Sequence, residues 1–433
     1  MKYIIFLFNF FLLAELQAQL AAGPMLGHTG MTNTSIWIQT QSEEELELIL
    51  DSPSIPGYSL SMIAKAEAPE FTAHFNVEGL KPGRSYNYRI ASKANDWSTE
   101  KFDFKTQVLW QYRSDPPEIN IALGSCTYIN EEEFDRPGKP YGGDYQIFES
   151  IAAMNPDLML WLGDNTYLRE PDMFSYEGMV HRYSHTRQNA EMQRLLRACP
   201  NYAIWDDHDY GPNDSNRSFI YKDWSLEVFK EFWANPTYGL EENGGITSSF
   251  KYADLEFFML DNRFFRTDAN IKTMSPEILG ESQQDWLIEA LQCSKAKFKF
   301  VLVGGQFLSD CKVYENHAQY AEERTKLINR MIAENIAGVI FLSGDRHSTS
   351  LSKLNISEGK SIFDLTVSPL TSTTYDHSKE ENTLRVEGSA ISERNFGLIH
   401  VSGKEKERTI EIKIYSADAA LLWEYKIAES ELY

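Results

Sequence analysis

The chain has 433 residues and a formal net charge of −22; 42% of its residues are hydrophobic and 13% are aromatic. This composition supplies enough apolar side chains for more than one folded domain and excludes a predominantly disordered chain. The acidic balance repels polyanions, so we expect no nucleic acid binding on the surface, whereas a small anionic substrate at a cationic site is compatible with it.

The N-terminus has the pattern of a secretory signal. Residues 3–14 form a short apolar run after Lys2, and small residues follow near positions 18 and 22. The run is shorter than a membrane span requires, and no other stretch is apolar enough to be one. We therefore interpret residues 1–18 as a signal peptide and expect an exported protein, periplasmic or secreted, with no transmembrane segment.

Residues 23–107 predict a small all-β domain. Segments in which apolar and polar residues alternate are separated by turn sequences such as Leu80–Arg84, and they lie at residues 35–40, 45–50, 71–77 and 85–90. This spacing favours an immunoglobulin-like or fibronectin-like sandwich. The segment carries no catalytic constellation, so we interpret it as a spacer, lid or docking module.

From residue 115 to residue 433 the pattern is that of an α/β domain. Apolar strand-like runs alternate there with amphipathic helix-like stretches. The six clearest strands are predicted at residues 119–123, 158–162, 202–205, 255–260, 298–303 and 339–342. Four more are predicted at residues 362–367, 398–401, 409–415 and 421–427. Helices are predicted around residues 144–154, 186–198, 221–233, 281–292 and 319–335.

The chain contains four cysteines. In the oxidising compartment that an exported protein meets, an even number invites disulfide pairing. Cys293 and Cys311 flank one predicted strand and could pair. Cys126 follows a strand end among polar residues, which points to a different use.

Polar side chains follow each of the six clearest strands, where ligands gather in α/β sheets. We expect these strand ends to converge on one site. The first three strands are followed by Cys126, by Asp164 with Tyr167, and by Asp206, Asp207, His208 and Asp209. The next three are followed by Arg263 with Arg266, by Gln306, and by Asp345 with His347.

The carboxylates in this set indicate a metal site. Adjacent buried carboxylates are costly unless a cation compensates them, and the Asp206–Asp214 motif contains no lysine or arginine. Asp164, Asp207 and Asp345 are hard oxygen ligands, suited to Ca²⁺, Mg²⁺ or Mn²⁺. The sequence leaves open which of Asp206, Asp207 and Asp209 faces the ion, and we predict Asp207.

Cys126, Tyr167 and His347 extend the ligand set. A thiolate and a phenolate favour a strongly Lewis-acidic ion such as Fe³⁺, and an imidazole suits several transition metals. Each residue also has a structural interpretation on its own: Cys126 as a small core residue and Tyr167 as a core aromatic. Asp164 could equally cap a helix, and Asp345 could pair with Arg346. That all of these structural roles hold at consecutive strand ends is less probable than a shared metal site.

Arg263 and Arg266 follow the fourth strand. A guanidinium group matches the oxygens of a phosphate in a bidentate manner. The alternative is an ion pair between Asp261 and one of these arginines that braces the loop. The sequence does not decide between the two.

Several motifs in this order resemble one known family. They are Gly124-Ser-Cys, Leu162-Gly-Asp-Asn-Thr-Tyr, Trp205-Asp-Asp-His-Asp-Tyr-Gly-Pro-Asn-Asp, Leu260-Asp-Asn-Arg-Phe-Phe-Arg, Leu279-Gly-x-x-Gln-x-x-Trp-Leu and Ser343-Gly-Asp-Arg-His. Together they are similar to the motifs of the alkaline phosphatase D (PhoD-like) family of calcineurin-like metallophosphoesterases. The resemblance covers nearly all of the chain after the signal peptide.

The resemblance implies a fold, a cofactor and residue roles. It implies a four-layer α/β/β/α sandwich with two mixed sheets face to face, preceded by the small β domain. Two or more metal ions are implied, with Ca²⁺ and Fe³⁺ first and other divalent ions next. The metal ligands implied are Cys126, Asp164, Tyr167, Asp207, Asp345 and His347. His208 corresponds to a histidine near the leaving group, and Arg263 and Arg266 fall on the arginine-bearing motif.

The function expected from this set is hydrolysis of a small anionic phosphoester, a diester or a monoester, by metal-activated hydroxide. Phospholipid and cell-wall polymers are candidate substrates, because some members of the family act on such material. Many members carry a twin-arginine export signal, whereas this chain has only Lys2 at that place, so we expect general secretion and metal loading outside the cytoplasm.

Two alternatives remain open: a metal-dependent hydrolase of another anionic ester, such as a sulfate ester, and a non-catalytic exported metal-binding adhesion module. The sequence does not indicate an oligomeric state.

Overall fold

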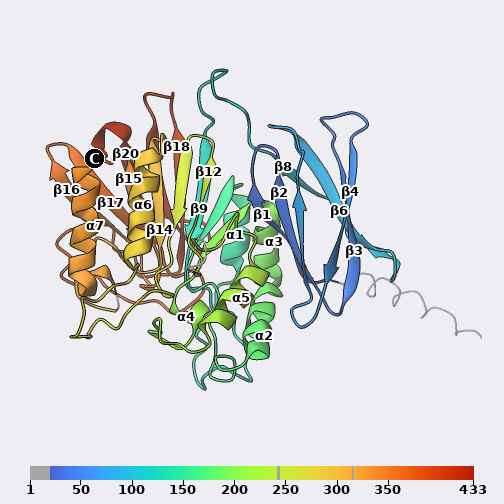
Figure 1. Cartoon of the computed structure of the whole chain (residues 1–433), viewed down its shortest axis with the longest axis horizontal. Helices are drawn as coiled ribbons and strands as arrows, with labels where there is room; N and C mark the ends of the chain where they lie inside the picture. The colour runs from blue at the N-terminus through green and yellow to red at the C-terminus, as the bar shows by residue number, and fades with distance from the viewer. Residues whose placement is uncertain (1–19, 241–243, 315) are drawn as a thin grey trace, which may run out of the picture.

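A computed structural model describes residues 20–240, 244–314 and 316–433 (Figure 1). The predicted signal peptide lies outside these residues. The described strands form four sheets: two six-stranded sheets in the larger part of the molecule and two smaller ones near the N-terminus. No helix among the described residues has both the length and the apolar character that a membrane crossing needs.

The N-terminal segment forms two antiparallel sheets that face each other. One contains β1 (Leu20–Thr29), β2 (Thr34–Thr40) and β5 (Thr72–Val77). The other contains β3 (Glu44–Asp51), β4 (Ser59–Ala66), β6 (Ser85–Ser92), β7 (Trp97–Ser98) and β8 (Phe102–Lys105). Buried residues alternate with more exposed ones along β6, as expected for a sheet with one face in a core. The predicted β sandwich architecture is confirmed.

This N-terminal sandwich is attached to the rest of the chain by buried contacts. Trp37 is fully buried, belongs to the central core and donates its indole N–H to the carbonyl of Glu231 at 2.7 Å. In the opposite direction, the side chain of Asn201 in the larger part of the molecule donates a hydrogen bond of 3.1 Å to the carbonyl of Leu26 in β1. Because these contacts exclude water, they hold the sandwich as a fixed neighbour of the larger part.

The first large sheet joins parallel and antiparallel strands. Its strand order is β11-β10-β9-β18-β19-β20. The parallel strands are β9 (Ile119–Gly124), β10 (Leu158–Leu162) and β11 (Asn201–Ile204). The antiparallel strands are β18 (Asn395–Ser402), β19 (Thr409–Ser416) and β20 (Leu421–Ala428).

The second large sheet has the order β12-β13-β14-β15-β17-β16. Its four central strands run parallel and its two edge strands are antiparallel to them. The strands are β12 (Ser248–Tyr252), β13 (Leu255–Met259), β14 (Phe298–Val303), β15 (Val339–Ser343), β16 (Ser350–Ser357) and β17 (Lys360–Thr366).

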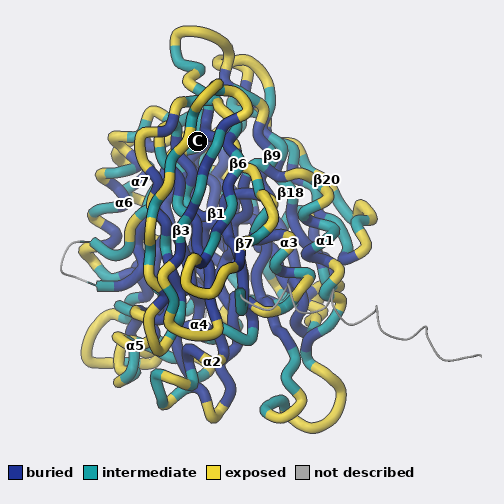
Figure 2. The backbone as a smooth tube through the Cα atoms, turned by 90° about the vertical axis from the view of Figure 1, so that its right-hand side faces the viewer, coloured by how far each residue is buried: buried dark blue, intermediate teal, exposed yellow. Residues whose placement is uncertain are grey.

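Helices cover the outer faces of the two large sheets. The described helices are α1 (Gln146–Ala153), α2 (Tyr176–Arg187), α3 (Ala190–Ala198), α4 (Asp207–Tyr210), α5 (Lys222–Phe232), α6 (Glu281–Cys293) and α7 (Ala321–Ala333). The four-residue α4 differs from the others because it lies at the end of β11, where the candidate site is. Short 3₁₀ turns lie at η2 (His317–Tyr320) and η3 (Glu429–Glu431). The outward surfaces of α6 and α7 are more exposed than the strands behind them (Figure 2).

The side chains of β14 show how the layers pack. Phe300 and Leu302 point into the large core cluster shared by both sheets, whereas Val301 and Val303 belong to a second cluster with residues of α6 and α7. A strand buried on both faces has a largely apolar sequence, interrupted in β14 only by Lys299, and this pattern allowed its prediction. The four-layer α/β/β/α arrangement is confirmed.

The four cysteines, all of which the structure describes, are free thiols. Cys293 is exposed at the end of α6, and Cys311 is half-buried in the loop beyond β14. The suggested Cys293–Cys311 disulfide is therefore wrong. Cys293 precedes β14 and Cys311 follows it. The length of the strand keeps two such residues apart, although they are close in the sequence.

Glu323 makes the stability of this fold depend on pH. Its buried carboxylate, on α7, accepts hydrogen bonds from the backbone N–H groups of Ile278, Leu279 and Gly280 at 2.8, 3.1 and 3.1 Å, just before α6 begins. Burial raises the pKa of Glu323 from its ordinary value of 4.5 to about 7. Because the folded pKa lies above the unfolded one, this contribution to stability is complete below pH 4.5 and is lost as the pH rises through 7.

We predict that the wild-type protein loses stability relative to Glu323→Gln as the pH rises. The difference in unfolding free energy should change by ~2–3 kcal/mol between about pH 4.5 and about pH 8, measured by urea unfolding. The exposed neighbour Glu322 provides a matched control. Glu322→Gln should follow the wild-type pH profile, and parallel profiles for Glu323→Gln and wild type would contradict the prediction.

Candidate metal centre

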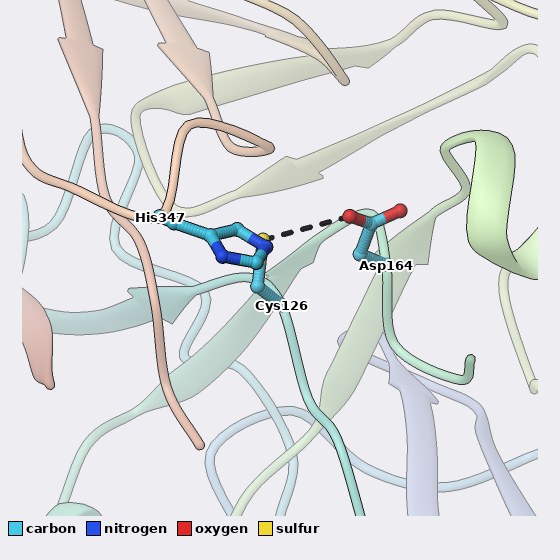
Figure 3. A group of neighbouring side chains, drawn as sticks. All are labelled: Cys126, Asp164 and His347. Carbon is cyan, nitrogen blue, oxygen red and sulfur yellow. Dashed lines mark hydrogen bonds between the residues drawn. The ribbon is translucent and has the colours of Figure 1, made fainter. Parts of the chain in front are cut away.

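The carboxyl ends of parallel strands from both large sheets meet at one place. The loops after β9, β10 and β15 bring Cys126, Asp164 and His347 together, with ligand atoms within 4.8 Å of one another (Figure 3). The sulfur of Cys126 lies 3.6 Å from Oδ2 of Asp164. The Tyr167 hydroxyl joins them, 3.2 Å from Asp164 Oδ2 and 3.1 Å from His347 Nε2.

Two further groups of possible ligands overlap with this one. Asp164, Asp207 and His208 form the second, and Asp206, Asp207 and Asp345 form the third, each within the same 4.8 Å limit. Asp164 and Asp207 each belong to two groups, so the three groups form one continuous set of donors. Such a set has donors for more than one ion.

The chemistry of the set fits metal ions. Oδ1 of Asp207 and Nδ1 of His208 are buried and have no hydrogen-bond partner among the residues that the structure describes. Burial and the neighbouring Cys126 and Asp207 raise the pKa of Asp164 well above its ordinary value. Burial also raises the pKa of the Cys126 thiol to about 11. Anionic groups crowded in a dry site repel one another, and a bound cation removes that repulsion.

Backbone conformation marks the same residues. Positive φ angles of 60°, 51°, 71° and 52° occur at Cys126, Asp164, Asp345 and His347, respectively. Residues other than glycine adopt this region at a cost of about 1–3 kcal/mol, and such strained residues concentrate at functional sites. Four of the predicted ligands are therefore held by the fold in a conformation that their side chains do not favour.

Two glycines allow the strand ends to approach. Gly163 has a φ of +91°, which only glycine adopts readily. Gly344 acts through space instead: a Cβ there would lie 2.5 Å from the Cβ of Ser125 and 2.6 Å from the carbonyl oxygen of Leu162. The ends of β9, β10 and β15 therefore touch at Gly344, where one sheet meets the other.

The acidic motif after β11 divides into different roles. Asp209, on the short helix α4, accepts hydrogen bonds from the backbone N–H groups of Asp206, Asn165 and Thr166 at 3.0, 3.0 and 3.1 Å. It therefore ties the loop after β10 to the loop after β11. Asp206 and Asp207 face the ligand set. Although burial opposes ionisation of Asp207, the charges of His208 and Arg263 hold its pKa below the usual range.

The two predicted arginines differ in surroundings. Arg263 is 1% exposed, and its Nε lies 2.5 Å from Oδ1 of the fully buried Asp206. A second contact, at 3.7 Å, joins it to Asp207. Arg266 lines the open cavity above the ligand set instead.

That cavity has a volume of about 700 Å³. Asp207, His208, Arg266, Asp345 and His347 lie in its wall. The imidazole of His208 stacks on the ring of Tyr167, with centroids 4.2 Å apart. Burial lowers the pKa of His347 to about 4, so this imidazole is neutral and able to act as a ligand at neutral pH.

Sequence reasoning missed several residues of this cavity. Arg346 is 4% exposed, lines the cavity and binds Gln306 at 2.7 Å and Glu380 at 2.6 Å. Asp214 donates its backbone N–H to Oδ2 of Asp207 at 2.8 Å. Arg346 lies in the Ser343-Gly-Asp-Arg-His motif, and Asp214 ends the motif that begins at Trp205. Membership of these motifs was the signal in the sequence that could have identified both as site residues.

Comparisons with known proteins place the chain in a family. The sequence model of the PhoD-like phosphatase family matches residues 121–414, and a domain of unknown function (DUF7800) matches residues 17–109. Alkaline phosphatase D of Bacillus subtilis (strain 168) is 24% identical over 334 residues, which are 66% of this chain and 54% of that protein. The match therefore spans about half of the length of this curated relative.

Two solved structures share the fold. A structure of PhoD has a TM-score of 0.76 at 17% identity, covering 95% of this chain and 92% of the other. A purple acid phosphatase from yellow lupin (Lupinus luteus) seeds has a TM-score of 0.65 at 12% identity, covering 94% of this chain and 74% of the other. The chain belongs to the PhoD-like phosphatase family.

The burial of Arg263 gives a prediction about stability. Arg263→Ala removes the cation that lies closest to the buried carboxylate of Asp206, and we expect a loss of ~3–5 kcal/mol in unfolding free energy. Arg217 lies between β11 and β12, and unlike Arg263, which follows β13, it is exposed, so Arg217→Ala should cost less than about 0.5 kcal/mol. Urea unfolding of both variants measures the difference. Equal stability of the two would show that Arg263 does not brace the site.

Proposed function

We propose that this protein is an exported, metal-dependent phosphoester hydrolase in which the strand-end ligand set holds two or more metal ions. The observation that carries the proposal is the continuous set of buried donors at the floor of a cavity whose wall also bears a cationic arginine and a histidine. A structural ion site has no use for the arginine. Membership of a phosphatase family supports the reaction class.

The ligands proposed are Cys126, Asp164, Tyr167, Asp207, Asp345 and His347. Asp206 belongs to one of the ligand groups, which makes it a further candidate. The thiol and phenol beside Asp164 and His347 suit Fe³⁺, and the carboxylates around Asp207 suit Ca²⁺ or another divalent ion. When bound, such ions supply Lewis acidity toward the phosphate oxygens and a hydroxide near neutral pH.

The remaining site residues are proposed to bind the phosphate and to protonate the leaving group. Arg266 faces the cavity, which supports a contact with the phosphate oxygens as negative charge develops on them. Arg263 is directed at Asp206, which supports a positioning role for it. His208 also belongs to a ligand group, but we assign it to the leaving group rather than to an ion, because it lies at the cavity wall on the ring of Tyr167. From there it can give a proton to the leaving alcohol oxygen.

The domain organisation proposed is a signal peptide at residues 1–18, a β-sandwich domain at residues 23–107 and a catalytic domain at residues 115–433. The apolar run at residues 3–14 supports export. The buried contacts of Trp37 and Asn201 support a β domain that stabilises the catalytic domain. The substrate class proposed is a small anionic phosphoester, with phospholipid and cell-wall polymers as candidate sources.

Chelation tests the proposed function. Hydrolysis of a chromogenic phosphodiester and of the matching monoester should stop when a chelator removes the ions, and adding back calcium, with iron where needed, should restore it. Asp207→Ala should lower both the bound metal and the activity by more than a hundredfold. Asp268, an exposed carboxylate at the rim of the same cavity, is the control. Asp268→Asn should keep its metal.

The outcomes separate the alternatives. Hydrolysis of a sulfate ester in place of both phosphoesters would favour a hydrolase of another anion. Bound metal without turnover of any ester would favour the adhesion module. Turnover that survives complete removal of metal would contradict the proposal.

His208 gives a separate prediction. His208→Ala should retain the wild-type metal content, measured by elemental analysis, and lose activity by about a hundredfold or more. The loss should shrink for esters with acidic leaving alcohols such as 4-nitrophenol, because these leave without a proton. An equal loss for acidic and basic leaving groups would contradict the proton-donor role.

A further inference from the structure

A second cavity opens beside the main one. It has a volume of about 530 Å³, within the range of cavities that bind small molecules. The two cavities share Tyr141, His208 and Asn213 in their walls. We call the second cavity the side arm; Tyr128, Phe134, Pro137, Tyr141, Leu168 and Met173 form its apolar wall.

The wall of the side arm is a built structure although the chain from Ser125 to Asp144 contains no helix or strand. The guanidinium of Arg169 lies 3.8 Å above the ring of Tyr128 and 2.9 Å from Oδ1 of Asp135. The Tyr128 hydroxyl donates to the same carboxylate oxygen at 2.7 Å. These contacts fix the aromatic ring of Tyr128, and the charges of Arg169 and Asp135 neutralise each other.

The side arm differs chemically from the main cavity. Of the proposed metal ligands, Asp207, Asp345 and His347 line the main cavity, whereas the side arm is lined by Tyr167 alone of this set. Charged residues also line the side arm: Arg136 and Glu170 are exposed and pair at 3.2 Å, and Lys139 is exposed. The rings of Tyr128, Tyr141 and Tyr167 form the part of its wall near His208. The main cavity is therefore suited to a phosphate, and the wall of tyrosine, phenylalanine, leucine and methionine side chains in the side arm is suited to an apolar group.

We propose that the side arm binds the leaving alcohol of the substrate and that this alcohol is apolar, an aryl or alkyl group of several carbons. The inference rests on the proposed function, because it places the phosphate at the ligand set. In hydrolysis the oxygen of water bonds to phosphorus, and the alcohol oxygen departs with the electron pair of the broken P–O bond and takes a proton. His208 is one of the three residues shared by the two cavities, so the carbon chain of an alcohol whose oxygen lies within reach of His208 can extend into the side arm.

The test uses alkyl phosphates whose alcohols run from methyl to octyl. Their leaving oxygens have nearly equal basicity, so kcat/KM reports binding of the chain. Wild-type kcat/KM should rise about threefold for each methylene that enters the arm. If the protein hydrolyses only diesters, the test uses phosphodiesters that carry one methyl group and one longer alkyl group, and the released alcohol is identified. We expect the longer alcohol to be released.

Variants of the wall provide the decisive comparison. Phe134→Ala should lower kcat/KM for the octyl ester by about tenfold and leave that for the methyl ester unchanged. Phe174 is an exposed phenylalanine, 59% accessible, that lines neither cavity. Phe174→Ala should behave as wild type. Because Phe134 also packs against His181, Pro137→Asp on the exposed loop is a second variant, with the same selective loss expected.

Two results would overturn the inference while leaving the proposed function intact. One is hydrolysis that does not depend on chain length, or that favours glycerol phosphate over the hexyl ester. The other is an equal loss for methyl and octyl esters in both wall variants. Absence of turnover for every ester by the metal-loaded wild type would instead contradict the proposed function itself.

Discussion

The structure depends on the mutual repulsion of acidic side chains that the fold buries together. Asp164, Asp206 and Asp207 are each at most 3% exposed, and Cys126 and Tyr167 add two further groups that become anionic on binding a metal. Arg263 provides one compensating charge, at Asp206. Arg263 does not balance all of the negative charge of these carboxylates, and bound cations would balance the rest. A cation site of this kind accounts for the convergence of donors from both sheets at one place.

The surrounding fold resists that repulsion through backbone contacts. Asp209 joins two loops through their N–H groups, and the missing side chain of Gly344 lets strands of the two sheets touch. The positive φ angles at Cys126, Asp164, Asp345 and His347 show that the backbone fixes the positions of these four proposed ligands. The Trp37 contact extends this rigidity to the N-terminal sandwich.

The sequence predicted the parts of the structure that follow from local pattern. Largely apolar runs located β9, β10, β13, β14 and β15, because strands buried on both faces contain few polar residues. Asn120, Glu256 and Lys299 are single interruptions in β9, β13 and β14. The helix α2 was missed because it buries Arg182 and Arg187, which a hydrophobic pattern counts as exposed. Motif spacing grouped the site residues at strand ends, but it could not show that Asp209 binds backbone or that Arg263 faces Asp206, since those choices depend on contacts between distant segments.

Anomalous X-ray diffraction from crystals of the active protein tests the central claim most directly. The account predicts more than one anomalous peak within the ligand set: one among Cys126, Asp164 and His347, and another beside Asp207. The absorption edges would identify each element. Active crystals with no anomalous peak among these residues, or with their only peaks elsewhere in the molecule, would contradict the account.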